Sequence, residues 1–368
     1  MRKGLEKLKK DPVLAAALVL AVLSAFLVKP TAAYLDYIDW RVLALLAALM
    51  LAVAALGKAG LFDTVTAVLL RRVGDTRRLA AVLVGICFFA AMLMTNDVAL
   101  ITFVPLTLML TAGTGTGTLT IPIVVLQTVA ANLGSALTPL GNPQNLYLYS
   151  LSGMELGEFL TVTAPMAGFS FLLLAAAVLC LPRKPLKAAD IRLNRPDRRG
   201  LLLWGVLFLV SLLAVLRLLP YGIALGLTVL AALLTDRTLL RRVDYSLLLT
   251  FLFFFVFVGN MKALPAVSEV LSGWVGGREM TVGILLSQVI SNVPAAMLLS
   301  GFTADYPALL LGVNLGGLGT LIASMASLIS YKLYAAAEGA KTGKYIAVFT
   351  AVNVGALAVL WLATAWLR

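Results

Sequence analysis

Two polar breaks in otherwise apolar helices each occur twice in this chain. The first copy of one break, residues 132–149, carries Asn, Leu, Gly, Thr, Leu and Tyr at positions that recur in residues 314–331. Each residue of the first copy corresponds to the residue that lies a constant number of positions later, as Asn132 corresponds to Asn314. We call this spacing the helix-break offset. A second break, Thr-Asn-Asp at 95–97, recurs as Ser-Asn-Val at 291–293, and the spacing between Asn96 and Asn292 is the hairpin offset. Polar backbone rich in Gly and Pro is tolerated at membrane depth only where it lines a protein-walled cavity. Matching breaks in two halves of a chain therefore indicate the binding site of a transporter.

The composition is that of a polytopic membrane protein. Apolar residues make up 61% of the chain, charged residues 12%, and the mean hydropathy is +1.00, values far from those of soluble domains. The net charge of +12 does not indicate a nucleic-acid partner, because the basic residues lie in short loops between apolar spans. The chain has two cysteines and no histidine, which excludes disulfide frameworks and Cys/His metal sites. No cofactor is expected apart from Na⁺ as a coupling ion.

We expect an all-α fold with about nine full spans and two re-entrant hairpins, given the ~20 apolar residues that a bilayer-spanning helix needs. The predicted segments are a cytoplasmic N-terminus at 1–12, a first inverted repeat at 13–181, a cytoplasmic basic loop at 182–200, a linking span at 201–219 and a second inverted repeat at 221–366. Each repeat is expected to contain one hairpin and one broken transmembrane helix. The hairpins are residues 79–112 and 280–303, and the broken helices are residues 118–152 and 306–338.

The distribution of Lys and Arg gives the orientation. With the basic N-terminus placed in the cytoplasm, 22 basic residues fall on the cytoplasmic side and six on the outside, as the positive-inside rule requires. The apolar run at 13–28 follows basic residues as in a secretory signal, but its length and the Lys29-Pro30 sequence after it favour a retained span. We therefore expect an integral protein of a bacterial or archaeal inner or plasma membrane, with an extracytoplasmic C-terminus and two antiparallel halves.

These breaks resemble the signature sites of the ion transporter superfamily. That superfamily includes divalent anion/sodium symporters, citrate-type carriers, arsenite pumps of the ArsB type and sodium/proton antiporters of the NhaD type. The likeness extends from about residue 13 to residue 366. It implies two inverted repeats, hairpins that meet near the bilayer midplane, a scaffold that forms a homodimer, and elevator-like movement of the domain that carries the hairpins.

The resemblance also implies the site residues. In similar symporters a cation lies between each hairpin tip and the neighbouring helix break, and the substrate bridges the two tips. Orphan carbonyls at such breaks suit a cation, and free N–H groups at helix starts suit an anion. The implied coupling-ion residues are Thr95, Asn96, Gly134, Thr138, Asn142, Ser291, Asn292, Gly316, Thr320 and Ser324. The implied substrate residues are Asn96, Asp97, Thr138, Pro139, Asn292 and Thr320.

Each of these residues also has a purely structural interpretation. The asparagines at the tips can cap the returning half-helices, the glycines can permit close helix packing, and the prolines can kink a span. Gln144 and Asn145 have no matching amides in the second half and are interpreted as caps of a half-helix. The Gly-Thr stretch at 113–118 is interpreted as a cytoplasmic turn, because no P-loop lysine follows it.

Asp97 distinguishes branches of the superfamily. Carboxylate symporters of this superfamily usually have Ser-Asn-Thr at both tips, whereas here the third positions are Asp97 and Val293. An aspartate at the bilayer centre costs about 2.5 to 3.5 kcal/mol on insertion scales, which makes it a functional candidate. Its expected role is to carry a proton or to neutralise a bound sodium ion. The structural alternative is an aspartate that complements the helix dipole.

The leading hypothesis is therefore a secondary transporter that couples a small anion or oxyanion to Na⁺ or H⁺. Two alternatives stay open: a sodium/proton antiporter centred on Asp97, and an efflux permease for arsenite or another metalloid. An enzyme is disfavoured, because the chain has no histidine, no cysteine pair and no cluster of acids at the midplane. The expected partners are a small anionic solute, the coupling ion, membrane lipid and a second copy of the chain. The basic loop at 183–200 is interpreted as a solvated connector or as a site for anionic lipid.

Overall fold

The computed structural model describes residues 11–70, 73–113, 119–185 and 196–367, and all regular structure in that part is helical. The helices of the first half are α2 (Pro12–Leu27), η1 (Ala32–Leu35), α3 (Trp40–Lys58), α4 (Leu61–Leu70), α5 (Thr76–Ala90), α6 (Asn96–Gly113), α7 (Thr120–Ser135), α8 (Pro143–Ser152) and α9 (Leu156–Leu179). The remaining helices are α10 (Arg198–Val215), α11 (Tyr221–Thr235), η3 (Arg237–Arg242), α12 (Tyr245–Lys262), α13 (Pro265–Val275), α14 (Glu279–Ile290), α15 (Asn292–Leu299), α16 (Tyr306–Leu315), α17 (Met325–Ala335) and α18 (Thr342–Leu367). The predicted all-α polytopic class is confirmed.

Five of the described helices are long and apolar enough to cross a bilayer, namely α3, α9, α10, α12 and α18. Shorter apolar helices of 10 to 17 residues accompany them, including α2, α11 and several half-helices at the breaks. Aspartates fix several helix starts: Asp39, Asp75 and Asp244 each accept a hydrogen bond from a backbone N–H in the first turn. Their carboxylates satisfy donors that would otherwise be left free at the helix ends.

The helices are interrupted at all four breaks. A short turn separates α5 from α6 just before Asn96, and residues 136–142 separate α7 from α8. In the second half, α14 passes into α15 at Ser291, and residues 316–324 separate α16 from α17. The exact limits of the two repeats stay a prediction. Residues 1–10 of the predicted N-terminal segment, residues 186–195 of the basic loop at 182–200 and residues 114–118 of the turn at 113–118 lie outside the described residues.

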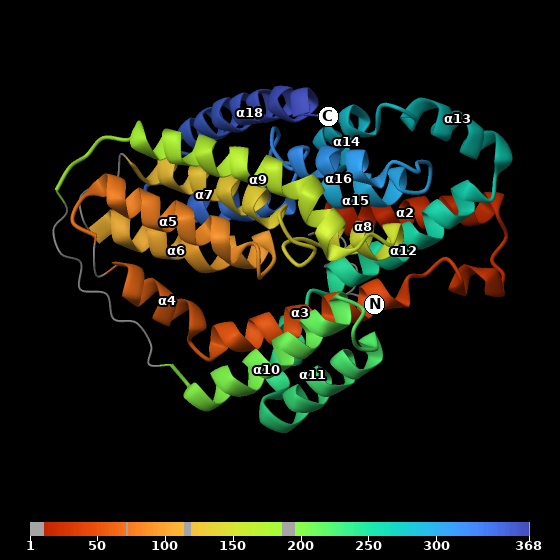
Figure 1. Ribbon diagram of the computed structural model, residues 1–368, viewed down its shortest axis with the longest axis horizontal. Coiled ribbons are helices and arrows are strands. Elements are labelled where there is room, and N and C mark those ends of the chain that lie inside the picture. The colour runs from red at the N-terminus through yellow and green to blue at the C-terminus, as the bar shows by residue number, and fades with distance from the viewer. Residues whose placement is uncertain (1–10, 71–72, 114–118, 186–195, 368) are drawn as a thin grey trace.

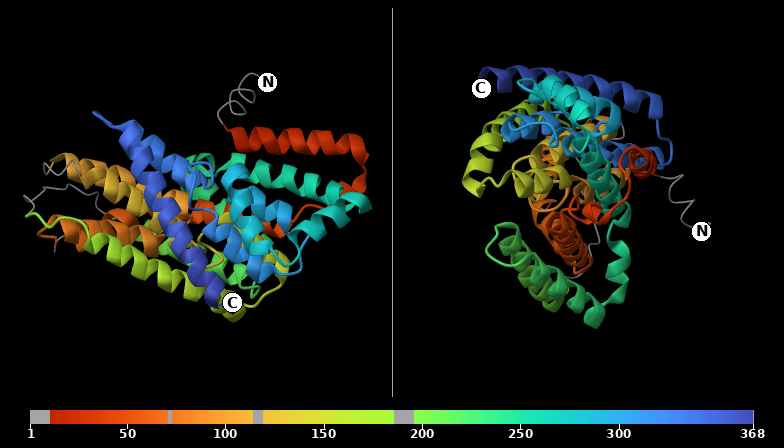
Figure 2. Two further views of the ribbon diagram at one scale, coloured as in Figure 1. Left: turned by 90° about the horizontal axis from the view of Figure 1, so that it is seen from above. Right: turned by 90° about the vertical axis from the view of Figure 1, so that its right-hand side faces the viewer.

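Helix packing recurs between the halves. Helix α5 packs against α7 as α14 packs against α16, and α6 packs against α17 as α15 packs against α8. The pair α2–α12 likewise matches the pair α11–α3. Figure 1 shows α10 and α11 beside α3 along one edge, with α18 along the opposite edge. In Figure 2 the α2 and α12 helices run side by side, and the right-hand view shows the α10–α11 pair at the edge of the molecule beside α3.

The protein core is divided among these groups of helices. One cluster of buried apolar side chains joins α5, α6, α7 and α18, and a second joins α3, α8, α12, α15 and α16. A smaller cluster holds α3 against α10 and α11. Large apolar side chains such as Phe26 and Trp366 are exposed, as expected for surfaces that face lipid.

Candidate substrate and ion site

The two hairpin breaks make the same backbone contact with the two helix breaks. The N–H of Asn96 donates to Gly141 O at 3.1 Å, and the N–H of Asn292 donates to Ala323 O at 3.0 Å. Gly141 and Ala323 are counterparts at the helix-break offset, just as the two asparagines are counterparts at the hairpin offset. The internal repeat therefore extends to individual hydrogen bonds.

The two predicted threonines repeat this relationship with their side chains. The Thr138 hydroxyl donates to Met92 O, and the Thr320 hydroxyl donates to Gln288 O at 3.1 Å. The acceptors, Met92 and Gln288, are counterparts at the hairpin offset. Each threonine therefore ties a helix break to the neighbouring hairpin.

Asn132 joins the two halves at the centre of the molecule. Its Oδ1 accepts hydrogen bonds from Asn96 Nδ2 at 3.0 Å and from Ser324 Oγ at 2.9 Å, while its Nδ2 donates to Gly317 O at 3.4 Å. Ser324 directly follows Ala323, the backbone partner of Asn292. Asn96 and Asn292 are thus linked through Asn132 and the segment Ala323-Ser324. The sequence contained Asn132 in its repeated motif but did not mark it as a site residue.

A second group of amides lies on the other side of the same breaks. Asn142 Nδ2 donates to Asn314 Oδ1 at 3.0 Å, and Asn314 Nδ2 donates to Asn145 Oδ1 at 2.7 Å. Asn142 also caps α8, because its side chain accepts from the N–H of Asn145. Asn145 Nδ2 donates to the carbonyl of Ser135 at the end of α7 and to those of Ala136 and Thr138 in the break that follows. The structure places Asn145 as a cap of a half-helix, in line with the sequence interpretation.

The two site glycines lie at close helix contacts. A Cβ atom on Gly134 would lie 2.1 Å from Phe88 O on α5, and one on Gly316 would lie 2.6 Å from Ser287 Oγ on α14. The Gly316 carbonyl also accepts a hydrogen bond from Gln288 Nε2 at 3.0 Å. These contacts match the packing interpretation of the glycines. Pro139 is buried within the break between α7 and α8.

Ser291 has an unusual backbone conformation. Its φ and ψ are 75° and 154°, and among the described residues only Arg217 is another non-glycine with positive φ. This region of dihedral space is strained for L-residues, and such strain is concentrated at functional sites. The Ser291 hydroxyl donates to Ala323 O at 3.4 Å. The second hairpin break is therefore held in shape by the second helix break.

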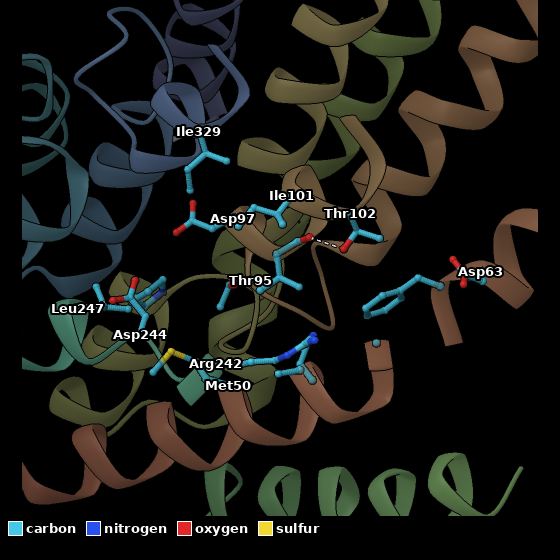
Figure 3. Close-up of a pocket in the computed structure, with 16 residues that line it drawn as sticks. Met50, Asp63, Thr95, Asp97, Ile101, Thr102, Arg242, Asp244, Leu247 and Ile329 are labelled. Atoms are coloured by element: carbon cyan, nitrogen blue, oxygen red, sulfur yellow. Dashed lines mark hydrogen bonds between the residues drawn. The ribbon is translucent and has the colours of Figure 1, made fainter. Parts of the chain in front are cut away.

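A cavity of about 570 Å³ opens beside the first hairpin break. Figure 3 shows Thr95 and Asp97 in it, facing residues of α3, α4, α12 and α17. The polar residues that line the cavity are Asp63, Thr95, Asp97, Thr102, Arg242 and Asp244. Asp97 Oδ1 is buried and has no hydrogen-bond partner in the described part of the chain. Asn96 and Asn292 are buried, with exposed fractions of 5% and 4%, and do not line the cavity.

A smaller cavity of about 230 Å³ lies among the corresponding helices of the other half. Tyr147 and Met297 line it. The counterpart of Tyr147 at the helix-break offset is Ile329, the counterpart of Met297 at the hairpin offset is Ile101, and both line the larger cavity. The Tyr147 hydroxyl lies 2.7 Å from Ser300 Oγ across the α8–α15 contact. The two cavities thus occupy repeat-related places and differ in volume, and the unpaired acid is in the larger one.

Apolar helices that are broken in pairs around buried amides, with a cavity beside each half, are the architecture of a membrane transporter. The comparison with known families agrees. The family model described as "Citrate transporter" matches residues 5–307. The chain belongs to the citrate transporter family, and the likeness to the ion transporter superfamily predicted from the sequence is confirmed.

Several named proteins are similar to this chain. It is 35% identical over 306 residues to the inner membrane protein YbiR of Escherichia coli strain K12, a match that covers 80% of each chain. It is 32% identical over 299 residues to the uncharacterized transporter MJ0456 of Methanocaldococcus jannaschii, covering 80% of this chain and 81% of that one. A shorter match, 24% identical over 43% of this chain and 28% of the other, is to the putative transporter arsB of Dictyostelium discoideum. The chain is thus an integral membrane protein of a transporter family.

Proposed function

We propose that this transporter couples a small anion or oxyanion to Na⁺ or H⁺ and that Asp97 holds the coupling ion. The observation that carries this proposal is the buried Asp97 Oδ1, which has no hydrogen-bond partner among the described residues and lines a cavity of about 570 Å³. A carboxylate oxygen in that position lacks the partners that buried charges normally have. Binding of a proton or a sodium ion would satisfy it.

Two helix starts could supply the attraction for an anion. Helix α15 begins after Ser291 and helix α17 after Ser324, and neither serine caps its helix with a side-chain hydrogen bond. The Asn292 N–H of α15 is already bound to Ala323 O, so the attraction for an anion there would come from the partial positive charge of the helix start rather than from that donor. Ile329 of α17 lines the larger cavity. An anion could then be held mainly by backbone dipoles, next to the break that contains Asp97.

Coupling follows from electrostatics. An anion and an ionised Asp97 repel each other, and this repulsion is stronger in a cavity of low dielectric than in water. A cation or proton on Asp97 removes the repulsion, so each ligand raises the affinity for the other, as linkage requires. The expected elevator-like movement would carry both ligands, held at the break that contains Asp97, from one side of the membrane to the other. The proposed coupling ion and solute are cargo, and no other cofactor is proposed.

The membrane setting is part of the same proposal. The excess of basic residues in one set of loops supports a cytoplasmic N-terminus and an extracytoplasmic C-terminus in a bacterial or archaeal inner or plasma membrane. The larger cavity is lined by Arg242 and Asp244 from the connection at 236–244, which the distribution of basic residues places in the cytoplasm. It would then face the cytoplasm. We also propose that the active form is a homodimer, as in similar symporters.

The decisive experiment is transport in proteoliposomes. Uptake of a panel of radiolabelled anions, including citrate, succinate, phosphate and sulfate, is measured under an imposed sodium gradient or pH gradient. We expect one gradient to drive uptake of at least one anion, and Asp97→Asn to remove the gradient dependence. The matched control is Asp63→Asn, the same change in the same cavity but on α4. Absence of gradient-driven uptake for every anion would refute the proposal.

A sodium/proton antiporter is the second candidate, and the same unpaired oxygen of Asp97 supports it. In this case addition of Na⁺ to acid-loaded vesicles would raise the internal pH without any anion present. If Asp97→Asn left that exchange intact, the antiporter hypothesis would fail. Efflux of a metalloid is a third outcome of the same assay, because neutral arsenite would move without a coupling ion. The partial similarity to the protein named putative transporter arsB is the observation that supports testing a metalloid.

A further inference from the structure

A groove on the outer surface of the first hairpin combines an apolar floor with a basic end. It lies between α5 and α9, has a volume of about 360 Å³, and is lined mainly by apolar side chains. Those on α5 include Val84 and Phe88, and those on α9 include Phe171, Leu174 and Val178. Arg77 and Arg78, at the start of α5, line the end of the groove that is remote from Phe88.

The basic end of this groove carries more positive than negative charge. Arg183 Nε lies 3.0 Å from Asp75 Oδ2, and Arg78 Nε lies 3.6 Å from the same oxygen. Arg77 Nε donates to Leu181 O at 2.9 Å. Two guanidinium groups therefore share the single carboxylate of Asp75, and the Arg77 guanidinium is bound only to a neutral carbonyl. Their terminal nitrogens donate no hydrogen bond to the described residues, so they are available to a ligand. A phosphodiester, with one negative charge and several acceptor oxygens, complements this end.

The length of the groove matches one leaflet of a bilayer. Both Arg77 and Phe88 lie on α5, three helical turns apart, and a helix rises about 16 Å over that distance at ~1.5 Å for each residue. Half of a hydrocarbon core of ~30 Å has about the same thickness. The Phe88 and Phe171 rings, with centroids 5.5 Å apart, lie toward the end of the groove that is remote from the arginines. An acyl chain that starts at the arginines would reach these rings near the midplane.

We propose that this groove binds an anionic phospholipid of the cytoplasmic leaflet, with an acyl chain between α5 and α9 and its phosphate at Arg77, Arg78 and Arg183. A basic site next to an apolar groove at the membrane surface is the chemistry that recognises such lipids. Helix α5 leads directly into the break that holds Asp97. A lipid in this groove would therefore contact α5, the helix that precedes the candidate coupling residue in the first hairpin.

Two pairs of variants separate the head group from the acyl chain. Arg77→Gln with Arg78→Gln removes two charges at the basic end, and its control is Arg198→Gln with Arg199→Gln, an adjacent exposed arginine pair at the start of α10. Gly85→Leu fills the groove, because a Cβ atom at Gly85 meets no other atom within 4 Å. Its control is Gly168→Leu on α9, where a Cβ atom also meets nothing within 4 Å.

The measurement is native mass spectrometry of the purified full chain with added phosphatidylglycerol or phosphatidylcholine of identical acyl chains. We expect preferential retention of one phosphatidylglycerol, and a loss of that preference by about tenfold in the double arginine variant. Gly85→Leu is expected to reduce retention of both lipids, while both controls behave as the unmodified protein. Melting temperatures of all variants show that they are folded.

Equal retention of the two lipids by the unmodified protein would overturn the proposal. An equal effect of the α10 arginine control would do the same, because it would indicate general surface charge. If Gly85→Leu instead changed the monomer–dimer ratio and left lipid retention intact, the groove would be a protein contact and the lipid proposal would be wrong. None of these readouts depends on transport, so the result is independent of the proposed solute.

Discussion

Asn132 and Ser324 come from opposite halves of the chain and are joined by a 2.9 Å hydrogen bond between the serine hydroxyl and the amide oxygen. The same oxygen accepts from Asn96 at the first hairpin break. One side chain therefore connects a hairpin of the first half with the broken helix of the second. This arrangement makes Asn132 a structural centre of the site, and its removal should affect both halves together.

Asn132→Ala is expected to lower stability more than a comparable change elsewhere. The substitution leaves two buried donors, on Asn96 and Ser324, without their acceptor, and each such loss costs about 1 to 3 kcal/mol. Thermal unfolding in detergent measures the effect as a decrease in Tm. Asn353→Ala is the matched control, because Asn353 Oδ1 is buried without a hydrogen-bond partner in the described structure. An equal decrease in both variants would contradict this role for Asn132.

Gly134→Ala tests the close contact between α7 and α5. The new Cβ atom would overlap the backbone carbonyl of Phe88, and overpacking of this kind costs about 1 to 3 kcal/mol. We expect a lower Tm and reduced transport, because α5 must shift. Gly168→Ala makes the same chemical change at an open position on α9. The packing interpretation fails if the two variants unfold at the same temperature.

The two cavities should be reachable from opposite sides of the membrane. Ile101 lines the larger cavity and Leu151 the smaller one, and both side chains are exposed. In a background with Cys180→Ser, which removes the exposed native thiol, we expect a membrane-impermeant maleimide to label Ile101→Cys only from the cytoplasmic side. Leu151→Cys should be labelled only from outside. Labelling of both positions from one side would contradict the predicted orientation.

Acid should weaken the contact between α3 and the end of α11. A hydrogen bond from Lys58, supported by two from Thr238, lowers the pKa of Asp236 from 3.8 to about 2. A group with a depressed pKa stabilises the folded state above its unfolded pKa and loses that contribution as the pH falls through the folded value. Stability linked to Asp236 should therefore decrease between about pH 4 and pH 2. Unfolding of Asp236→Asn, followed by Tm against pH, should lack this component, and an unchanged profile would show that the pair contributes nothing.

The internal repeat anticipates many contacts around the candidate site. The helix-break offset pairs Thr138 with Thr320. Thr138 donates to the carbonyl of Met92 and Thr320 to that of Gln288, and these two acceptors are counterparts at the hairpin offset. Backbone contacts of Asn96 and Asn292 follow the same rule. A repeat carries this information because two similar sequences form similar local contacts. The fold class could likewise be predicted, since apolar spans and their breaks are local features.

Contacts that the repeat does not duplicate could not be predicted. The Gln288 side chain donates to the carbonyls of Gly316 and Leu318 in the second helix break. Its counterpart in the first half is Met92, so the internal repeat does not predict these hydrogen bonds. Arg217 is a similar case: it donates to Gly153 O and Tyr149 O from the connection between α10 and α11. Such contacts depend on how distant segments meet in three dimensions, which the order of residues in one half does not reveal.

The conformation of Ser291 makes the two hairpins mechanically unequal. With φ at 75°, this serine holds dihedral angles that glycine adopts freely and other residues adopt at a cost. The first hairpin turns at Thr95 without positive φ, so only the second stores tension in its peptide backbone. Backbone strain of this kind is released when the contacts that hold the residue in its conformation change. The two hairpins therefore differ in stored backbone strain, although their backbone contacts with the helix breaks are matched.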